Sequence, residues 1–174
     1  MIDVMFSPAC VRVLGYSTLI SALRWSSSLL LSDLVGGLFI TSPERLGKYW
    51  RESSAFEDFA LGEPGVREAV LLHRAGNLET RVIQEGLGPA GQNFSYSSDL
   101  EAIFTRAQEL ALSRKDVQSG TKPFVIPEDL LLALAQLGEA PIVRRLVSSG
   151  LDLKRLEEAV KTTKDLGPLE SPSQ

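Results

Sequence analysis

The segment that decides the fold is Phe124-Val-Ile-Pro-Glu-Asp-Leu-Leu-Leu-Ala-Leu-Ala135. Proline followed by two acidic residues suits the first turn of a helix, because the ring fixes a helical φ and carboxylates favour the positive end of the helix dipole. The apolar run that follows, without glycine or further proline, predicts a buried helix. Downstream, Gly150 is expected to end one helix and Asp152 to cap the last one.

Similar helix starts recur upstream of this segment. Ser7-Pro8 and Ser42-Pro43 each place an N-capping side chain before a proline at the first helical position. Ser98, with a glutamate three residues later, matches a capping box. No segment alternates polar and apolar residues between hairpin turns. The sequence therefore predicts an all-α protein.

The second half of the sequence repeats the pattern of the first. A shift of 90 residues aligns positions 7–21 with 97–111, large on large and small on small, and a shift of 96 aligns 33–50 with 129–146. A pattern kept across two helix boundaries indicates an internal duplication. Since neither copy can bury its apolar face alone, we predict two pseudo-repeated four-helix units that share one core.

The expected organisation is a single domain spanning residues 1–174. Its parts are a degenerate first repeat at 7–60, a central insertion or linker at 61–97, a second repeat at 98–163 and a disordered, Pro/Ser-rich tail at 164–174.

The second repeat resembles a known family. The matching residues are Phe124–Ala135, Gly138-Glu139, Val143, Leu146, Gly150-Leu151-Asp152 and Leu156. They are similar to the Clp repeat, which forms the double-repeat N-terminal domain of the Clp-type AAA+ unfoldases. Asp129 stands where the family has a histidine, Pro127 stands where it has Thr or Ser, and Leu31-Ser32-Asp33 replaces the Glu-containing turn of the first repeat.

The resemblance implies a non-catalytic protein-docking module, which recruits substrates or adaptors to a Clp-type unfoldase or protease, or regulates it. Some family members bind phosphorylated arginine near this turn, where a carboxylate accepts the guanidinium fork. By this resemblance the partner-binding residues are Glu128 and Asp129 in the second repeat, and Ser32 and Asp33 in the first. The alternative is that the two acids at 128 and 129 only favour a helix start.

The central segment is predicted to pack on the first repeat. Two adjacent glycines, Gly36 and Gly37, each weaken a helix by roughly 1 kcal/mol relative to alanine, so a close neighbour is expected there. We expect residues 62–93 to be that neighbour and to cover the first-repeat surface on which Clp domains take ligands. Val66–Arg74 and Leu78–Glu85 are compatible with two helices or with a hairpin.

Composition excludes several classes of function. Eighteen basic against twenty-two acidic side chains give a net charge of −4, which argues against nucleic acid or an anionic membrane as the partner. One cysteine, Cys10, and one histidine, His73, exclude a disulfide framework and metal sites that need several of either, and we expect no metal and no cofactor. No Gly-Lys-Ser/Thr loop is present for nucleotide hydrolysis.

Two alternatives to the docking module remain open. A small hydrolase would use Cys10 as nucleophile and His73 as base. Because Cys10 occupies an apolar position of the duplicated pattern, a buried structural thiol is favoured, and we predict that the protein is not an enzyme. The second alternative is a helical oligomerisation or regulatory module unrelated to proteolysis. The sequence leaves the partner and the oligomeric state open.

The apolar residues near the amino terminus do not predict a membrane span. Arg12, Arg24 and Asp33 interrupt them, and a helix needs about 20 apolar residues to cross the hydrocarbon core. The opening also lacks the positive charge of a secretory signal. We therefore expect a cytoplasmic protein.

Overall fold

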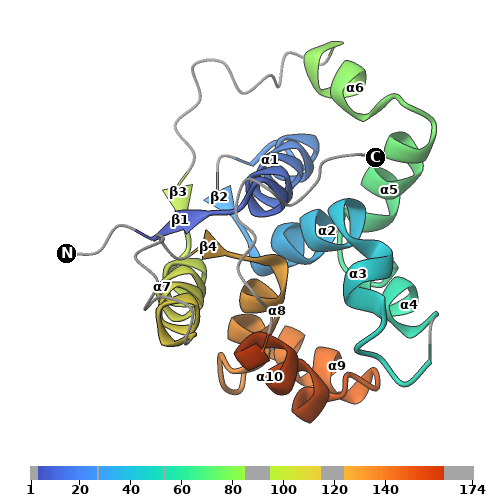
Figure 1. The fold of residues 1–174 in the computed structure, drawn as a ribbon. Helices are drawn as coiled ribbons and strands as arrows, with labels where there is room; N and C mark the ends of the chain where they lie inside the picture. The colour runs from blue at the N-terminus through green and yellow to red at the C-terminus, as the bar shows by residue number, and fades with distance from the viewer. Residues whose placement is uncertain (1–3, 27, 53, 85–94, 115–123, 163–174) are drawn as a thin grey trace.

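The computed structural model describes residues 4–26, 28–52, 54–84, 95–114 and 124–162. Within these ranges the chain forms ten α-helices and four two-residue strands, arranged as Figure 1 shows. In chain order they are β1 (Met5–Phe6), α1 (Pro8–Leu23), β2 (Ser28–Leu29), α2 (Leu31–Thr41), α3 (Pro43–Gly47), α4 (Ala55–Leu61), α5 (Val66–Arg74), α6 (Leu78–Gln84), β3 (Ser95–Tyr96), α7 (Ser98–Ser113), β4 (Phe124–Val125), α8 (Pro127–Ala135), α9 (Pro141–Ser148) and α10 (Leu153–Thr162). The predicted all-α class is confirmed. Eight of the described helices, α1–α4 and α7–α10, start within the two predicted repeats, and the other two, α5 and α6, belong to the central segment.

The two longest helices, α1 and α7, start in the same way. The Ser7 hydroxyl accepts the Cys10 N–H at 3.3 Å, and the Ser97 hydroxyl accepts the Leu100 N–H at 3.2 Å. These contacts satisfy backbone donors that the first turn of a helix leaves unpaired. The predicted cap of α7 was therefore wrong by one position, because Ser98 is already the first helical residue.

Helices α2 and α8 start after an apolar residue instead. Their N-cap positions are Leu30 and Ile126, which have no polar side chain to offer. The carboxylate three residues later fills the gap: Asp33 accepts the Leu30 N–H and Asp129 accepts the Ile126 N–H, both at 2.9 Å. Each aspartate thus does the half of a capping box that normally falls to a glutamate.

The short strands join segments that are far apart in the sequence. β1 pairs with β4 in parallel, with Met5 opposite Phe124, and β2 pairs with β3 in parallel, with Ser28 opposite Ser95. No alternation of polar and apolar residues announces strands of two residues, so the sequence did not predict them. They tie the entry and exit of α1 to the entries of α8 and α7.

One main cluster of buried apolar side chains runs through the molecule. Helix α8 lies in it with its first eight residues buried, and α2 contributes Leu34, Val35 and Leu38. The cluster also contains side chains from α1, α3, α4, α5, α7, α9 and α10. Segments from both ends of the sequence therefore share one core.

The central segment forms helices rather than a hairpin. α5 packs on α2 and α6 packs on α1, as expected for a segment lying on the first repeat. A Cβ added at Gly36 would collide first with Ile20 of α1 and would also meet Val66 at the start of α5 at 3.2 Å, so the central segment is only one of its two close neighbours. The expectation was wrong for Gly37, whose added Cβ would collide with the Val13 carbonyl of α1. Residues 85–93 of the expected cover, and the expected tail at 164–174, lie outside the described residues.

Candidate functional site

Glu128 and Asp129 lie side by side in the first turn of α8, and both are buried. They point to different partners. Asp129 receives two hydrogen bonds from the guanidinium of Arg114, which follows α7. Glu128 receives Nε of Arg45 at 3.0 Å on both of its carboxylate oxygens, and Nη2 of the same arginine at 2.8 Å. Asp129 is thus neutralised by the arginine that ends α7, and Glu128 by an arginine of α3.

Burial sets the titration behaviour around this turn. It raises the pKa of Asp129 to about 6, against the opposing effect of the Arg114 hydrogen bonds. It also raises the pKa of Tyr49 to about 12, to which the negative charge of Glu128 adds. The Tyr49 hydroxyl lies 3.4 Å from Glu128 Oε2 and donates to it. Tyr49 therefore stays protonated beside the Glu128 carboxylate at neutral pH.

Asp33 and Ser32 occupy the corresponding turn of α2. Asp33 is buried and pairs with Arg24, whose Nε lies 3.0 Å from Oδ1, and Ser32 next to it is half-buried. The four predicted partner-binding residues therefore form two separate turns rather than one site. In both turns the aspartate is held by an arginine and by the backbone, which is a structural role.

The guanidinium that the resemblance assigns to a ligand is supplied at Glu128 by the chain itself. Arg45 occupies the carboxylate fork, and its side chain is mostly buried against α8. Sequence reasoning missed Arg45, because its partner lies 83 positions away and no local pattern marks such a pair. The carboxylate fork of Glu128 is therefore occupied by a guanidinium of the same chain.

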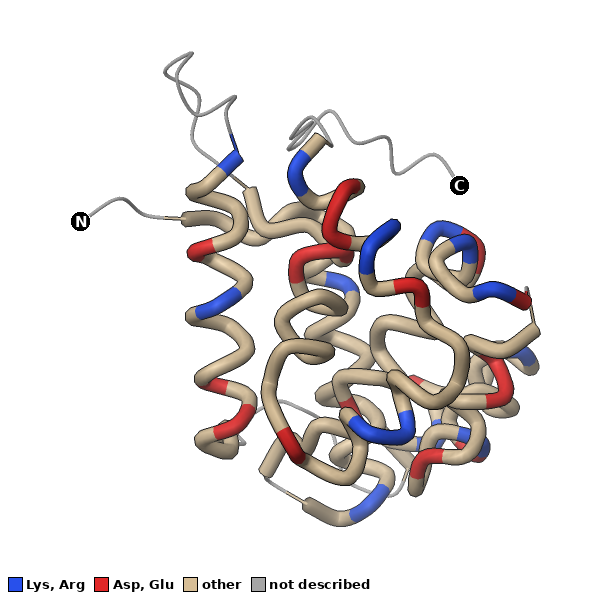
Figure 2. The backbone as a smooth tube through the Cα atoms, turned by 90° about the horizontal axis from the view of Figure 1, so that it is seen from below, with Lys and Arg blue, Asp and Glu red and all other residues tan. Residues whose placement is uncertain are grey.

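One exposed cavity is lined by residues of α2, α3, α4, α5 and α10 and of the segment that follows α3. It has a volume of about 630 Å³, and we call it the junction pocket. Four cationic side chains line it, Lys48, Arg51, Arg74 and Arg155, together with the carboxylates of Glu44 and Glu57. Figure 2 shows acidic and basic positions spread over the molecule, and five of the ten described helices carry both signs. At the pocket, four cations stand against two carboxylates.

Aromatic rings form part of the junction pocket. Trp50 and Phe56 stack with their ring centroids 4.4 Å apart, and Phe39 meets Phe56 edge-on at 5.2 Å. The Trp50 indole N–H donates to the Ser149 hydroxyl at 2.8 Å, which fixes the ring. Phe56 and Phe59 are core residues, whereas Tyr96 is exposed.

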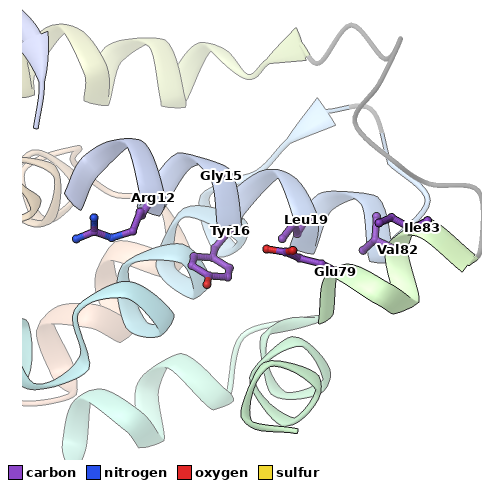
Figure 3. Close-up of a pocket in the computed structure, with 7 residues that line it drawn as sticks. All are labelled: Arg12, Gly15, Tyr16, Leu19, Glu79, Val82 and Ile83. Carbon is purple, nitrogen blue, oxygen red and sulfur yellow. The ribbon is translucent and has the colours of Figure 1, made fainter. Parts of the chain in front are cut away.

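A second cavity, the α1–α6 groove, is mainly apolar and has a volume of about 510 Å³. Figure 3 shows Gly15, Tyr16 and Leu19 of α1 along it, with Val82 and Ile83 of α6. Its charged residues are at separate places: Arg12 lies at one end of the row, and Glu79 reaches from α6 to the neighbourhood of Leu19 (Figure 3).

The Cys10 and His73 pair does not form a catalytic arrangement. Cys10 is completely buried in the main core, and burial raises the pKa of its thiol above the ordinary range. His73 packs its ring edge-on against Tyr16 at 5.1 Å. Tyr16 lies roughly 9 Å along α1 from Cys10, at 1.5 Å per residue. A buried thiol with a raised pKa is a poor nucleophile.

The sequence matches no protein-family model and no curated protein. Among the described residues, no helix combines the length and apolar character needed to span a bilayer. The same residues contain no cluster of three or more His, Cys, Asp or Glu side chains placed to hold a metal ion.

Proposed function

We propose that this chain is a non-catalytic protein-docking domain of the Clp-repeat type, which binds an acidic segment of a partner through the junction pocket. The partner is a component of a Clp-type proteolytic system: the unfoldase or protease, an adaptor, or a substrate protein. The observation that carries the proposal is the paired arrangement of helices, capping residues and strands in the two halves of the chain.

The pairing extends to polar contacts. Arg24 and Arg114 stand 90 positions apart, and they hold the aspartates Asp33 and Asp129, which stand 96 positions apart. The two shifts are those that align the apolar residues of the two halves. The strand pairing relates the two halves in the same way. The strand before α1 pairs with the strand before α8, and the strand before α7 pairs with the strand before α2.

Aligned apolar positions also share their burial. Aligned pairs that are buried in both halves include Cys10/Leu100, Val13/Ile103, Ser17/Ala107, Ile20/Leu110, Ser21/Ala111, Leu34/Leu130, Val35/Leu131, Leu38/Leu134, Leu46/Ile142 and Trp50/Leu146. A common set of buried positions in both halves supports an origin by duplication and a pseudo-twofold arrangement. This double-repeat plan is what the Clp resemblance requires.

The junction pocket supplies the chemistry for a protein partner. Arg74 is paired with Glu57 at 2.8 Å. In the described part of the chain, no carboxylate lies within ion-pair distance of Lys48, Arg51 or Arg155. Cations without an ion-pair partner around an exposed cavity favour carboxylates of a partner. A net charge of −4 on the whole chain makes this pocket the place where an acidic segment is attracted.

Titration of the fluorescently labelled chain with a purified Clp-type unfoldase from the same organism tests the proposal. Saturable binding that weakens with salt is expected, and the double variant Lys48→Glu/Arg155→Glu is expected to weaken it by at least about tenfold. Arg67→Glu/Lys161→Glu, an equal change of charge at two exposed positions outside the pocket, is the matched control. Absence of binding by the wild type to the unfoldase, its protease and its adaptors would contradict the proposed partner. Equal binding by the double variant would contradict the pocket.

A further inference from the structure

The outer face of α1 is unusually apolar for an exposed surface. Of its sixteen residues only Arg12 is charged. Val11 exposes 59% of its surface, and Ile83, on the helix that flanks the α1–α6 groove, exposes 67%. Isolated apolar residues on a surface need no explanation, but these lie beside or within a groove of about 510 Å³. The groove is therefore a candidate for an interface.

Gly15, in the middle of α1, has no explanation within the described structure. A Cβ there would meet no atom within 4 Å, whereas Cβ atoms at Gly36 and Gly37 would collide with α1. Glycine in a helix interior costs roughly 1 kcal/mol relative to alanine. The aligned position in α7 is Thr105, so the repeat pattern does not call for glycine. A glycine on the outer face of a helix lets the backbone of another helix come close.

Helix α6 covers only one half of α1. Val82 packs with Leu19, Ala22 and Leu23, which lie in the carboxyl-terminal half of α1. On the outer face of the amino-terminal half, Val11 and Arg12 are exposed, whereas Cys10 and Val13 face the core. The groove thus has a wall beside one end of α1 and an open face beside the other.

The two charged side chains of the groove lie on opposite sides of Gly15, Arg12 beside the open half of α1 and Glu79 beside the half that α6 covers. Arg12 lies one turn before Gly15, and Glu79 lies near Leu19, one turn after it (Figure 3). In the described part of the chain neither side chain is in an ion pair. A twofold axis at Gly15 would bring Arg12 of one copy to Glu79 of the other, twice. It would also bring the open half of α1 against α6 of the other copy. Self-complementarity of this kind is what an isologous dimer requires.

We propose that the protein forms a twofold-symmetric homodimer through the α1–α6 groove, with the two α1 helices antiparallel and crossing at Gly15. Arg12 of each copy pairs with Glu79 of the other, and Ile83 of each copy covers the region of Val11 on the other. The interface uses α1 and α6, whereas the junction pocket is formed by other helices. The dimer therefore does not depend on the proposed docking function.

Sedimentation equilibrium of the full chain tests the dimer. The wild type is expected to dimerise, and Gly15→Leu is expected to be a monomer with an unchanged circular dichroism spectrum. Thr105→Leu, the same kind of change at the aligned exposed position of α7, is expected to leave the dimer intact. A wild type that is still monomeric at about 100 µM, equivalent to a binding free energy weaker than about −5.5 kcal/mol, overturns the proposal. Dimerisation of Gly15→Leu with wild-type affinity overturns it too.

Charge exchange tests the pairing separately. Arg12→Glu and Glu79→Arg are each expected to raise the dimer dissociation constant by at least about tenfold, and the double variant to restore it. Arg67→Glu and Glu68→Arg, on the exposed face of α5, are the matched controls. Failure of the double variant to recover affinity would overturn the antiparallel register. Unfoldase binding, measured in parallel on Gly15→Leu, distinguishes this outcome from failure of the docking proposal.

Discussion

Arg45 and Glu128 are bound to each other across 83 positions of sequence, with Nε of the arginine 3.0 Å from both carboxylate oxygens. The arginine comes from α3 and the glutamate from the first turn of α8. The pair therefore joins the two halves of the chain. It also fills the position at which a ligand guanidinium was expected from the sequence.

Arg45→Met is predicted to destabilise the protein by about 2–3 kcal/mol, because it leaves the buried Glu128 without its counter-charge. Urea denaturation followed by circular dichroism measures the loss. Arg144→Met is the matched control, since Arg144 is 72% exposed and reaches Glu139 only at 3.7 Å. Its expected effect is within about 0.5 kcal/mol. Equal midpoints for Arg45→Met and wild type would contradict the structural role of the pair.

The two arginine–aspartate pairs are predicted to differ in strength. The Arg114 side chain is 3% exposed and the Arg24 side chain is 22% exposed, while both aspartates are buried. Arg114 also donates to the Phe124 carbonyl at 2.6 Å. Arg114→Met is therefore expected to cost about 3–5 kcal/mol, and Arg24→Met less. The same denaturation experiment ranks them, and the reverse order would show that burial does not control the cost.

The cost of Arg114→Met is predicted to depend on pH. In the folded state the pKa of Asp129 is raised from 3.8 to about 6, so its contribution to stability is present below about pH 4 and is lost as the pH rises through about 6. Removing the Arg114 charge raises this pKa further. The difference in unfolding free energy between wild type and variant should therefore grow from pH 5 to pH 7. A constant difference over this range would contradict the raised pKa, and Arg144→Met serves again as the control.

Glycine to alanine substitutions are predicted to have opposite effects at two positions that are 22 residues apart. At Gly37 the new methyl group would collide with the Val13 carbonyl and the Ser17 hydroxyl, so the variant is expected to lose about 2–4 kcal/mol. At Gly15 the space is open, and alanine should stabilise the monomer by about 0.5–1 kcal/mol. Unfolding of Gly15→Ala is measured at low protein concentration, where the proposed dimer dissociates. Destabilisation of Gly15→Ala there would contradict the open space.

Local signals predicted the helices well. Ser7, Pro127 and Asp152 mark helix starts that the structure contains, because caps and first-turn prolines act within three residues of themselves. The error at Ser98 arose because two adjacent serines compete for one cap, and only Ser97 has the extended backbone that a cap needs. The choice between helix and hairpin at residues 66–84 needed the surfaces of α1 and α2, which no local pattern contains.

The candidate site was less predictable than the fold. Glu128 and Asp129 stand out in the sequence as acids at a helix start, and that role explains Asp129. Their arginine partners come from α3 and from the end of α7, so their pairing is a consequence of tertiary packing. The junction pocket likewise draws cations from segments around residues 48, 74 and 155, which only the folded chain brings together.

The exchange of strands has a consequence for biosynthesis. Met5 is paired with Phe124, so the first strand leaves the ribosome long before its partner has been translated. At 5–20 residues per second the delay is roughly ten seconds. During this interval the nascent amino-terminal half exposes an unpaired strand edge and the apolar face that α8 later covers. Chaperones that bind nascent chains therefore have a long period in which to act on this protein, and synonymous codons that slow translation before residue 124 would lengthen it.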